Sequence, residues 1–296
     1  MISGPKSSDT EISRERLAFT IYHILREFDP EKKGYLTLTR FNKVAYLIHR
    51  DIEENLSINT GLPWYWYLYG SVVPLEYCPQ SVYVKEELRD GEWRVFYRRE
   101  PRITVLPVQE QKQILDRVKH WRDKRLGTDD AIDLAYQNVE IPFLREIKKF
   151  SDSIADPQSF KALIADKASV SRQLDRMLET YPEDKLNALL PIYLRFDNML
   201  RALIADAKGS ALAEHADLIE GFRRVILVNL RAHLCENMPE KWIADQSEES
   251  SRIKEHFEIE YDEEERRVFC RLPKKKDDMG YAKKLMEISW QSYMEG

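Results

Sequence analysis

The stretch SVYVKEELRDGEWRVFYRRE, residues 81–100, decides the class of the N-terminal fold. Two runs of β-prone residues flank Asp90-Gly91, a dipeptide typical of two-residue hairpin turns because both positions tolerate positive φ. Upstream of it, apolar residues recur at helical spacing in two successive segments. Two amphipathic helices followed by a β-hairpin predict a winged-helix-like domain.

The stretch FDPEKKGYLTLTRF joins these two helices and has the outline of a calcium loop. Counted from Asp29 as the first ligand, however, Lys33 occupies the fifth position and Arg40 the twelfth, where Ca²⁺ requires oxygen ligands. Because both side chains are cations, we expect no calcium binding. The stretch instead predicts a turn after the first helix, with Thr37 or Thr39 capping the second.

The remainder of the chain is mainly helical in its periodicity. Helix breaks are expected at Gly127, Pro157, Pro182 and Gly209, and Pro191 should kink or split an apolar run. The predicted fold class is mainly α with small β-hairpins. The sequence predicts a flexible lead-in (1–12), the winged-helix-like domain (13–107), a helical domain (108–244) and a small C-terminal α+β unit, a hairpin and helix (245–296).

The C-terminal unit admits two interpretations. HFEIEYDEEERRVFCRLP alternates apolar and polar residues on both sides of an acidic turn, which favours a hairpin. A continuous charged helix through Glu265 is the alternative. The following MGYAKKLMEISWQSYM has the apolar spacing of a helix.

Composition narrows the class of protein. The 296 residues are 43% hydrophobic and 33% charged, and no apolar run approaches the roughly 20 residues that span a bilayer. The N-terminus lacks the apolar segment of a secretory signal, so we expect a cytoplasmic protein without a membrane partner. Cys78, Cys235 and Cys270 are far apart without a CxxC pair, which indicates reduced thiols and no zinc site. The net charge of −5 argues against a protein whose whole surface is basic and binds nucleic acid without specificity.

The stretch TGLPWYWYLYGSVVP is dense in aromatic residues and bounded by Gly and Pro. We expect a short turn or helix that runs into an irregular, buried loop. Its rings can pack the core between the helices and the wing, or the outward-facing ones can form a surface that binds a partner protein. The candidate partner-binding residues are Trp64, Tyr65, Trp66, Tyr67 and Tyr69.

The longer stretch LTLTRFNKVAYLIHRDIEENLSINTGLPWYWYLYGSVVP resembles the Panacea domain, the SocA-like antitoxin family. The matching residues are Lys43, Tyr46, Leu47, Gly61, Trp66, Tyr69, Gly70, Val72 and Pro74. Ser71 departs from the family, which usually has proline there. The resemblance covers the N-terminal third and implies a non-enzymatic module, found beside toxins and in phage-defence operons, that binds and restrains a partner protein.

The sequence carries no recognisable catalytic motif. A P-loop, GxGxxG, HExxH and GxSxG are absent. The six histidines, His23, His49, His120, His215, His233 and His256, are scattered without a partner in sight. A nuclease would use carboxylates such as Asp51, Glu53 and Glu54 in its active site. The nuclease pattern of an acidic residue followed by Glu-x-Lys on adjacent strands is not found here. We therefore expect no enzyme, no cofactor and no bound metal.

Basic clusters supply an alternative function. The possible nucleic-acid-binding residues are Arg94, Arg98, Arg99 and Arg102 on and after the wing, and Lys274, Lys275 and Lys276 after the second predicted hairpin. The leading hypothesis is a protein-binding subunit, antitoxin-like or an accessory component of a bacterial defence or toxin–antitoxin complex. The alternative is a DNA-contacting winged-helix accessory subunit of an SMC-like ATPase complex.

Overall fold

The chain forms two compact units in a computed structural model that describes residues 7–82, 85–155, 166–205 and 216–271. The first unit comprises Met1–Glu140 and Leu230–Ser247, and the second comprises Ile141–Asn229 and Glu248–Gly296. The protein is mainly helical with small antiparallel sheets, which confirms the predicted fold class. No helix among the described residues has the length and apolar character needed to cross a membrane.

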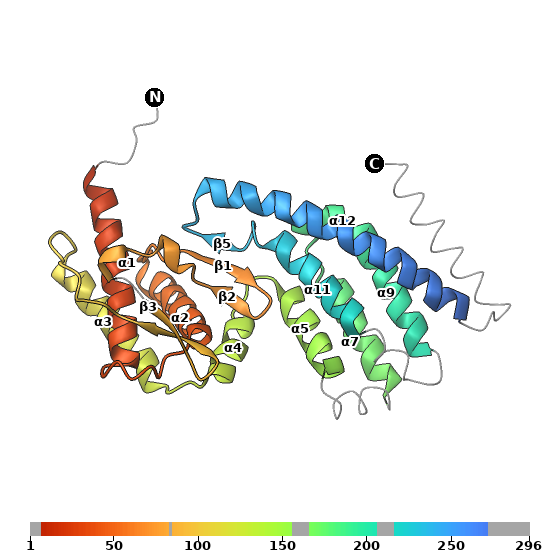
Figure 1. Cartoon of the computed structure of the whole chain (residues 1–296), viewed down its shortest axis with the longest axis horizontal. Helices are drawn as coiled ribbons and strands as arrows, with labels where there is room; N and C mark the ends of the chain where they lie inside the picture. Colours follow the sequence, from red (N-terminus) through yellow and green to blue (C-terminus); the bar gives the residue numbers. More distant parts are fainter. Residues whose placement is uncertain (1–6, 83–84, 156–165, 206–215, 272–296) are drawn as a thin grey trace. The chain divides into compact units, whose positions relative to one another are not determined.

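The first unit is built around helix α2 (Leu38–Leu56). Helices α1 (Ser7–Phe28), α3 (Val108–Asp123) and α4 (Thr128–Gln137) all pack against it (Figure 1). Because most of its side chains are buried, α2 is the core of this unit rather than a surface helix. The unit continues to Glu140 instead of ending near residue 107, since α3 and α4 complete the packing around α2.

The turn between α1 and α2 forms as predicted, with an acidic side chain at its centre. The Thr37 hydroxyl accepts the Arg40 backbone N–H and caps α2. The Asp29 carboxylate accepts the N–H groups of Lys33 at 2.9 Å and Gly34 at 2.7 Å. Asp29 therefore holds the turn by bonding to backbone donors.

The wing is a two-stranded hairpin of β3 (Lys85–Arg89) and β4 (Glu92–Phe96). Asp90 and Gly91 form its turn, both at positive φ, which confirms the prediction. The base of the wing is anchored to the segment before α2, where Val95 N–H donates to the Leu36 carbonyl.

The aromatic stretch is a second hairpin, so the prediction of an irregular loop is wrong. Strands β1 (Trp64–Tyr67) and β2 (Gly70–Val72) pair, and β5 (Cys235–Glu236) joins the other edge of β1. Buried and half-buried residues alternate along β1, as expected for a strand with one face on a core. Short 3₁₀ turns follow at Leu75–Tyr77 and Gln80–Val82.

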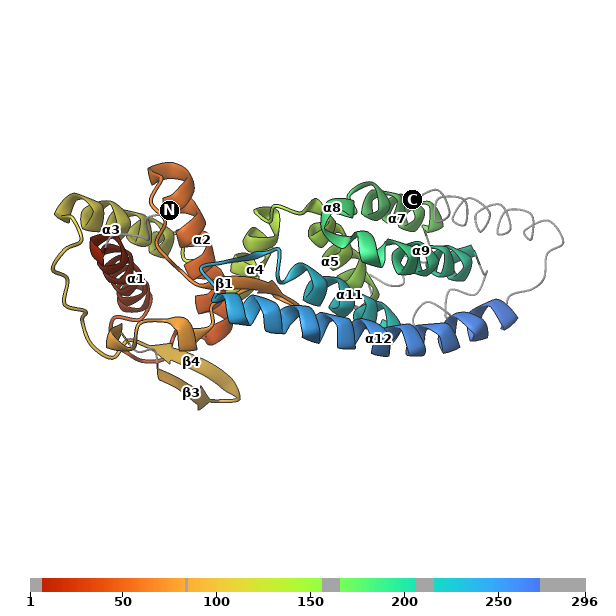
Figure 2. The same cartoon turned by 90° about the horizontal axis from the view of Figure 1, so that it is seen from above.

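The second unit is helical, and its bounds differ from those of the predicted helical domain (108–244). It contains α5 (Pro142–Ala155), α7 (Lys167–Glu179), α8 (Glu183–Leu186), a 3₁₀ turn (Asn187–Leu189), α9 (Leu190–Ala205) and most of α11 (Ala216–Leu230) and α12 (Glu240–Arg271). Helices α5, α7, α9 and α11 lie side by side, and α12 runs along them (Figures 1 and 2). Stacked rings of Phe196 and Phe222 mark the core. The apolar run around Pro191 is split, as expected, because α9 begins just before the proline.

Two local predictions are wrong. The expected C-terminal hairpin is instead the continuous helix α12, because Phe257 and Tyr261 are both buried four residues apart while Ile259 between them is 65% exposed. The predicted flexible lead-in is wrong for residues 7–12, which belong to α1. Residues 1–6 lie outside the described residues. Lys274, Lys275, Lys276 and the predicted last helix lie outside the described residues.

Candidate functional site

The five aromatic candidates separate by strand face. Trp64 and Trp66 are buried against the ring of Tyr46, with centroids 4.8 and 5.8 Å away. Tyr65 and Tyr67 are half-buried beneath the Arg231 guanidinium, which lies 5.6 and 4.3 Å from their ring centroids. Tyr69, in the β1–β2 turn, is 64% exposed. The tryptophans are therefore core residues.

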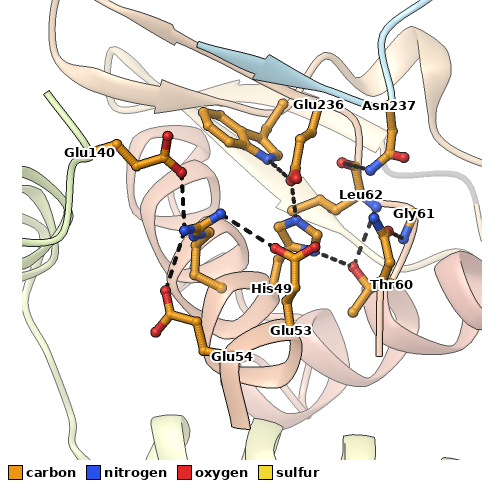
Figure 3. A network of polar contacts seen from close by, with 12 residues as sticks. His49, Glu53, Glu54, Thr60, Gly61, Leu62, Glu140, Glu236 and Asn237 are labelled. Atoms are coloured by element: carbon orange, nitrogen blue, oxygen red, sulfur yellow. Dashed lines mark hydrogen bonds and ion pairs between the residues drawn. The ribbon is translucent and has the colours of Figure 1, made fainter. Parts of the chain in front are cut away.

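A histidine of α2 stands at the centre of a polar network (Figure 3). His49 is fully buried, with Nδ1 2.8 Å from the Thr60 hydroxyl and Nε2 2.6 Å from a carboxylate oxygen of Glu236 on β5. The same oxygen accepts the Trp64 indole N–H at 2.8 Å, and the Thr60 hydroxyl accepts the Leu62 N–H at 3.3 Å. A neutral ring satisfies these groups when Thr60 donates to Nδ1 and Nε2–H donates to Glu236.

Charged groups surround this histidine. Arg50, the next residue of α2, pairs with Glu53 at 3.4 Å, Glu54 at 3.3 Å and Glu140 at 3.1 Å (Figure 3). The hydrogen bond from His49 lowers the pKa of the Glu236 carboxyl and outweighs the effect of burial, which raises it. Glu236 is thus held as a carboxylate.

The carboxylate–imidazole–hydroxyl order of Glu236, His49 and Thr60 is also the order of a hydrolytic triad. Thr60 is fully buried, however, so its oxygen cannot meet a substrate carbonyl. The same network brings donor atoms of His49, Glu53 and Glu236 within 4.8 Å of one another, a set that could hold a metal ion. Sequence reasoning missed this set, because Glu236 lies far along the chain from α2. The local signal was His49 and Glu53 one helical turn apart.

A buried lysine joins α2 to the aromatic hairpin. Lys43 is 2% exposed, and its Nζ donates to the Ser71 carbonyl at 2.5 Å. Burial lowers the pKa of this amine to about 7. Gly70, at φ +94°, passes beside the lysine chain, where an added Cβ would lie 3.3 Å from Lys43 Cε.

The wing carries both apolar and basic side chains. Leu88 and Trp93 form a cross-strand pair and are 60% and 49% exposed. Arg94 is half-buried and pairs with Glu92 at 2.5 Å, and the Arg89 guanidinium lies 4.8 Å from the Phe96 ring centroid.

The other predicted basic residues follow the wing. Arg98, Arg99 and Arg102 are exposed, and Arg99 Nε donates to the Ser81 carbonyl at 3.3 Å. The predicted basic residues are therefore not equivalent, since Arg94 is half-buried whereas Arg98, Arg99 and Arg102 are exposed.

No family model, curated protein or solved structure matches this chain. The resemblance to the Panacea domain stays a prediction.

Proposed function

We propose that this chain is a non-enzymatic subunit that binds a partner protein, as an antitoxin-like or accessory component of a bacterial defence or toxin–antitoxin complex. The observation that carries the proposal is the exposed cross-strand pair of Leu88 and Trp93, named here the wing tip. Large apolar side chains exposed together are typical of protein-binding surfaces, where tryptophan is enriched among the residues that dominate affinity.

The wing tip is presented on an anchored support. Further down the same hairpin Val95 and Phe96 are buried, and Val95 N–H is bonded to the Leu36 carbonyl. A hairpin held at its base offers its tip with little ordering cost on binding. The partner that fits is a protein with an apolar pocket for the Trp93 ring.

The charges around the wing tip favour a protein over DNA. Asp90 and Glu92 are exposed at the turn, where their negative charges would repel DNA phosphates. Glu92 also forms an ion pair with Arg94. The alternative of a DNA-contacting subunit is supported by exposed Arg98 and Arg99 after β4.

The test is quantitative mass spectrometry of proteins that co-purify with the tagged full chain, followed by binary titration of the recovered partner. Replacing Leu88 and Trp93 together by Ala should weaken partner binding by about 30-fold or more, the equivalent of about 2 kcal/mol. Val108→Ala, at another exposed apolar residue, is the matched control and should bind as wild type. Equal binding by the double variant and this control would overturn the proposal.

The same preparations decide the DNA alternative. A variant with Arg98, Arg99 and Arg102 changed to Glu should keep the protein partner. If the chain instead binds duplex DNA with a steep salt dependence that this variant loses, the DNA-contacting function is supported.

A further inference from the structure

We propose that His49, Glu53 and Glu236 form a binding site for one divalent transition-metal ion, with Zn²⁺ as the best fit. The three side chains come from α2 and β5, and their ligand atoms lie within 4.8 Å of one another. His49 and Glu53 are four residues apart on one helix, which places both on the same face. Pairing of β5 with β1 brings Glu236 to that face.

The distances suit a small ion after a modest adjustment. Zinc binds imidazole nitrogen and carboxylate oxygen at about 2.0–2.2 Å, so neighbouring ligand atoms of a tetrahedral ion lie roughly 3.3 Å apart. The 2.6 Å separation of His49 Nε2 and the Glu236 oxygen must therefore widen, and Glu53 must approach. Both glutamate side chains retain about 30% exposure, which leaves them room to move and gives the ion a route from solvent.

Each ligand is already held by a further polar group. Thr60 contacts Nδ1 of His49, the Trp64 indole N–H bonds the Glu236 oxygen, and Arg50 pairs with Glu53. Such outer hydrogen bonds orient the ligands of metal sites. When the ion takes Nε2, the ring stays neutral: the proton on Nε2 is exchanged for one on Nδ1, where the Thr60 oxygen accepts it.

Charge and ligand type select the ion. Two carboxylates balance the charge of a divalent cation, and one imidazole favours zinc over calcium, which prefers six to eight oxygens. Three protein ligands leave a fourth position for water.

The test is calorimetric titration of Zn²⁺ into the metal-stripped full chain. The wild type should bind one ion at this site. Glu53→Gln and Glu236→Gln should each lower the affinity for Zn²⁺ by at least about 100-fold, because loss of an outer hydrogen bond alone lowers metal affinity 10–100-fold. The matched control is Glu54→Gln, because Glu54 loses the same charge beside Glu53 and also pairs with Arg50, yet is not a ligand. The affinity of Glu54→Gln for Zn²⁺ should lie within about threefold of the wild-type affinity.

Two further measurements test whether each variant is folded and whether zinc binds at His49 rather than elsewhere. Circular dichroism of each variant should match wild type, and nitrogen NMR of the His49 ring should show Nε2–H without zinc and Nδ1–H with it. The proposal is overturned if wild type binds no zinc, if Glu53→Gln and Glu54→Gln bind equally well, or if the ring keeps its Nε2 proton in saturating zinc.

Discussion

Replacement of the buried amine of Lys43 by Met should change how stability depends on pH. Burial lowers the folded-state pKa of Lys43 to about 7, against a value of 10.5 for an exposed lysine. Between these two pH values the unfolded chain binds a proton that the folded chain does not. The contribution of Lys43 to the stability of the wild type should therefore rise with pH across this window and stay constant below and above it.

The magnitude follows from the same two values. Each pH unit within the window contributes up to about 1.4 kcal/mol, so the whole interval corresponds to about 5 kcal/mol. Lys43→Met keeps an unbranched chain of similar size and has no group to titrate. The difference in unfolding free energy, wild type minus Lys43→Met, should increase by about 3 kcal/mol between pH 7 and pH 9.5.

Guanidinium unfolding at closely spaced pH values measures this difference, since other titrating groups cancel between the two proteins. Lys112→Met, which removes an exposed lysine of α3, is the matched control for loss of a charge and should run parallel to wild type. A constant difference between wild type and Lys43→Met over this range would refute the reasoning. It would mean that the folded protein keeps the amine protonated.

Two other contacts give independent predictions. Burial raises the pKa of the Glu15 carboxyl, but hydrogen bonds from the hydroxyl and backbone of Thr104 and from the next two N–H groups hold it at about 2. Stability from Glu15 should be present above pH 4.5 and lost as pH falls toward 2, and urea unfolding of Glu15→Gln should lack this loss. Asp29→Ala removes the acceptor of Lys33 and Gly34 and should cost about 2–4 kcal/mol in thermal unfolding. Added Ca²⁺ should not shift the wild-type melting temperature, and a saturable shift lost in Asp29→Ala would contradict this turn assignment.

Local signals predicted the elements that depend on neighbouring residues. The wing follows from Asp90-Gly91, whose turn geometry requires nothing distant, and the Thr37 cap follows from the helix that it begins. The C-terminal segment failed because Phe257, Ile259 and Tyr261 fit both a strand and a helix. Burial of Phe257 and Tyr261 alone decides for the helix.

The aromatic hairpin and the His49 network depend on a distant segment. Strand β1 has the sequence pattern of a loop because Gly and Pro bound it. Its partner β5 follows only after Ile141–Asn229, the first segment of the second unit. His49 gave no signal by itself, since Glu236 is 187 residues away. Long-range pairing of this kind leaves no pattern in a short window.

The late position of strand β5 in the chain also delays completion of the first unit during synthesis. Its residues follow Glu140 by roughly one hundred positions, which a ribosome translates in about 5–20 s. Throughout that interval β1 has an open edge and His49 has no carboxylate partner. The first unit therefore cannot complete its three-stranded sheet until a late part of its own chain has been made. A chain that ends at residue 140 keeps the edge of β1 open, and another strand can pair with such an edge.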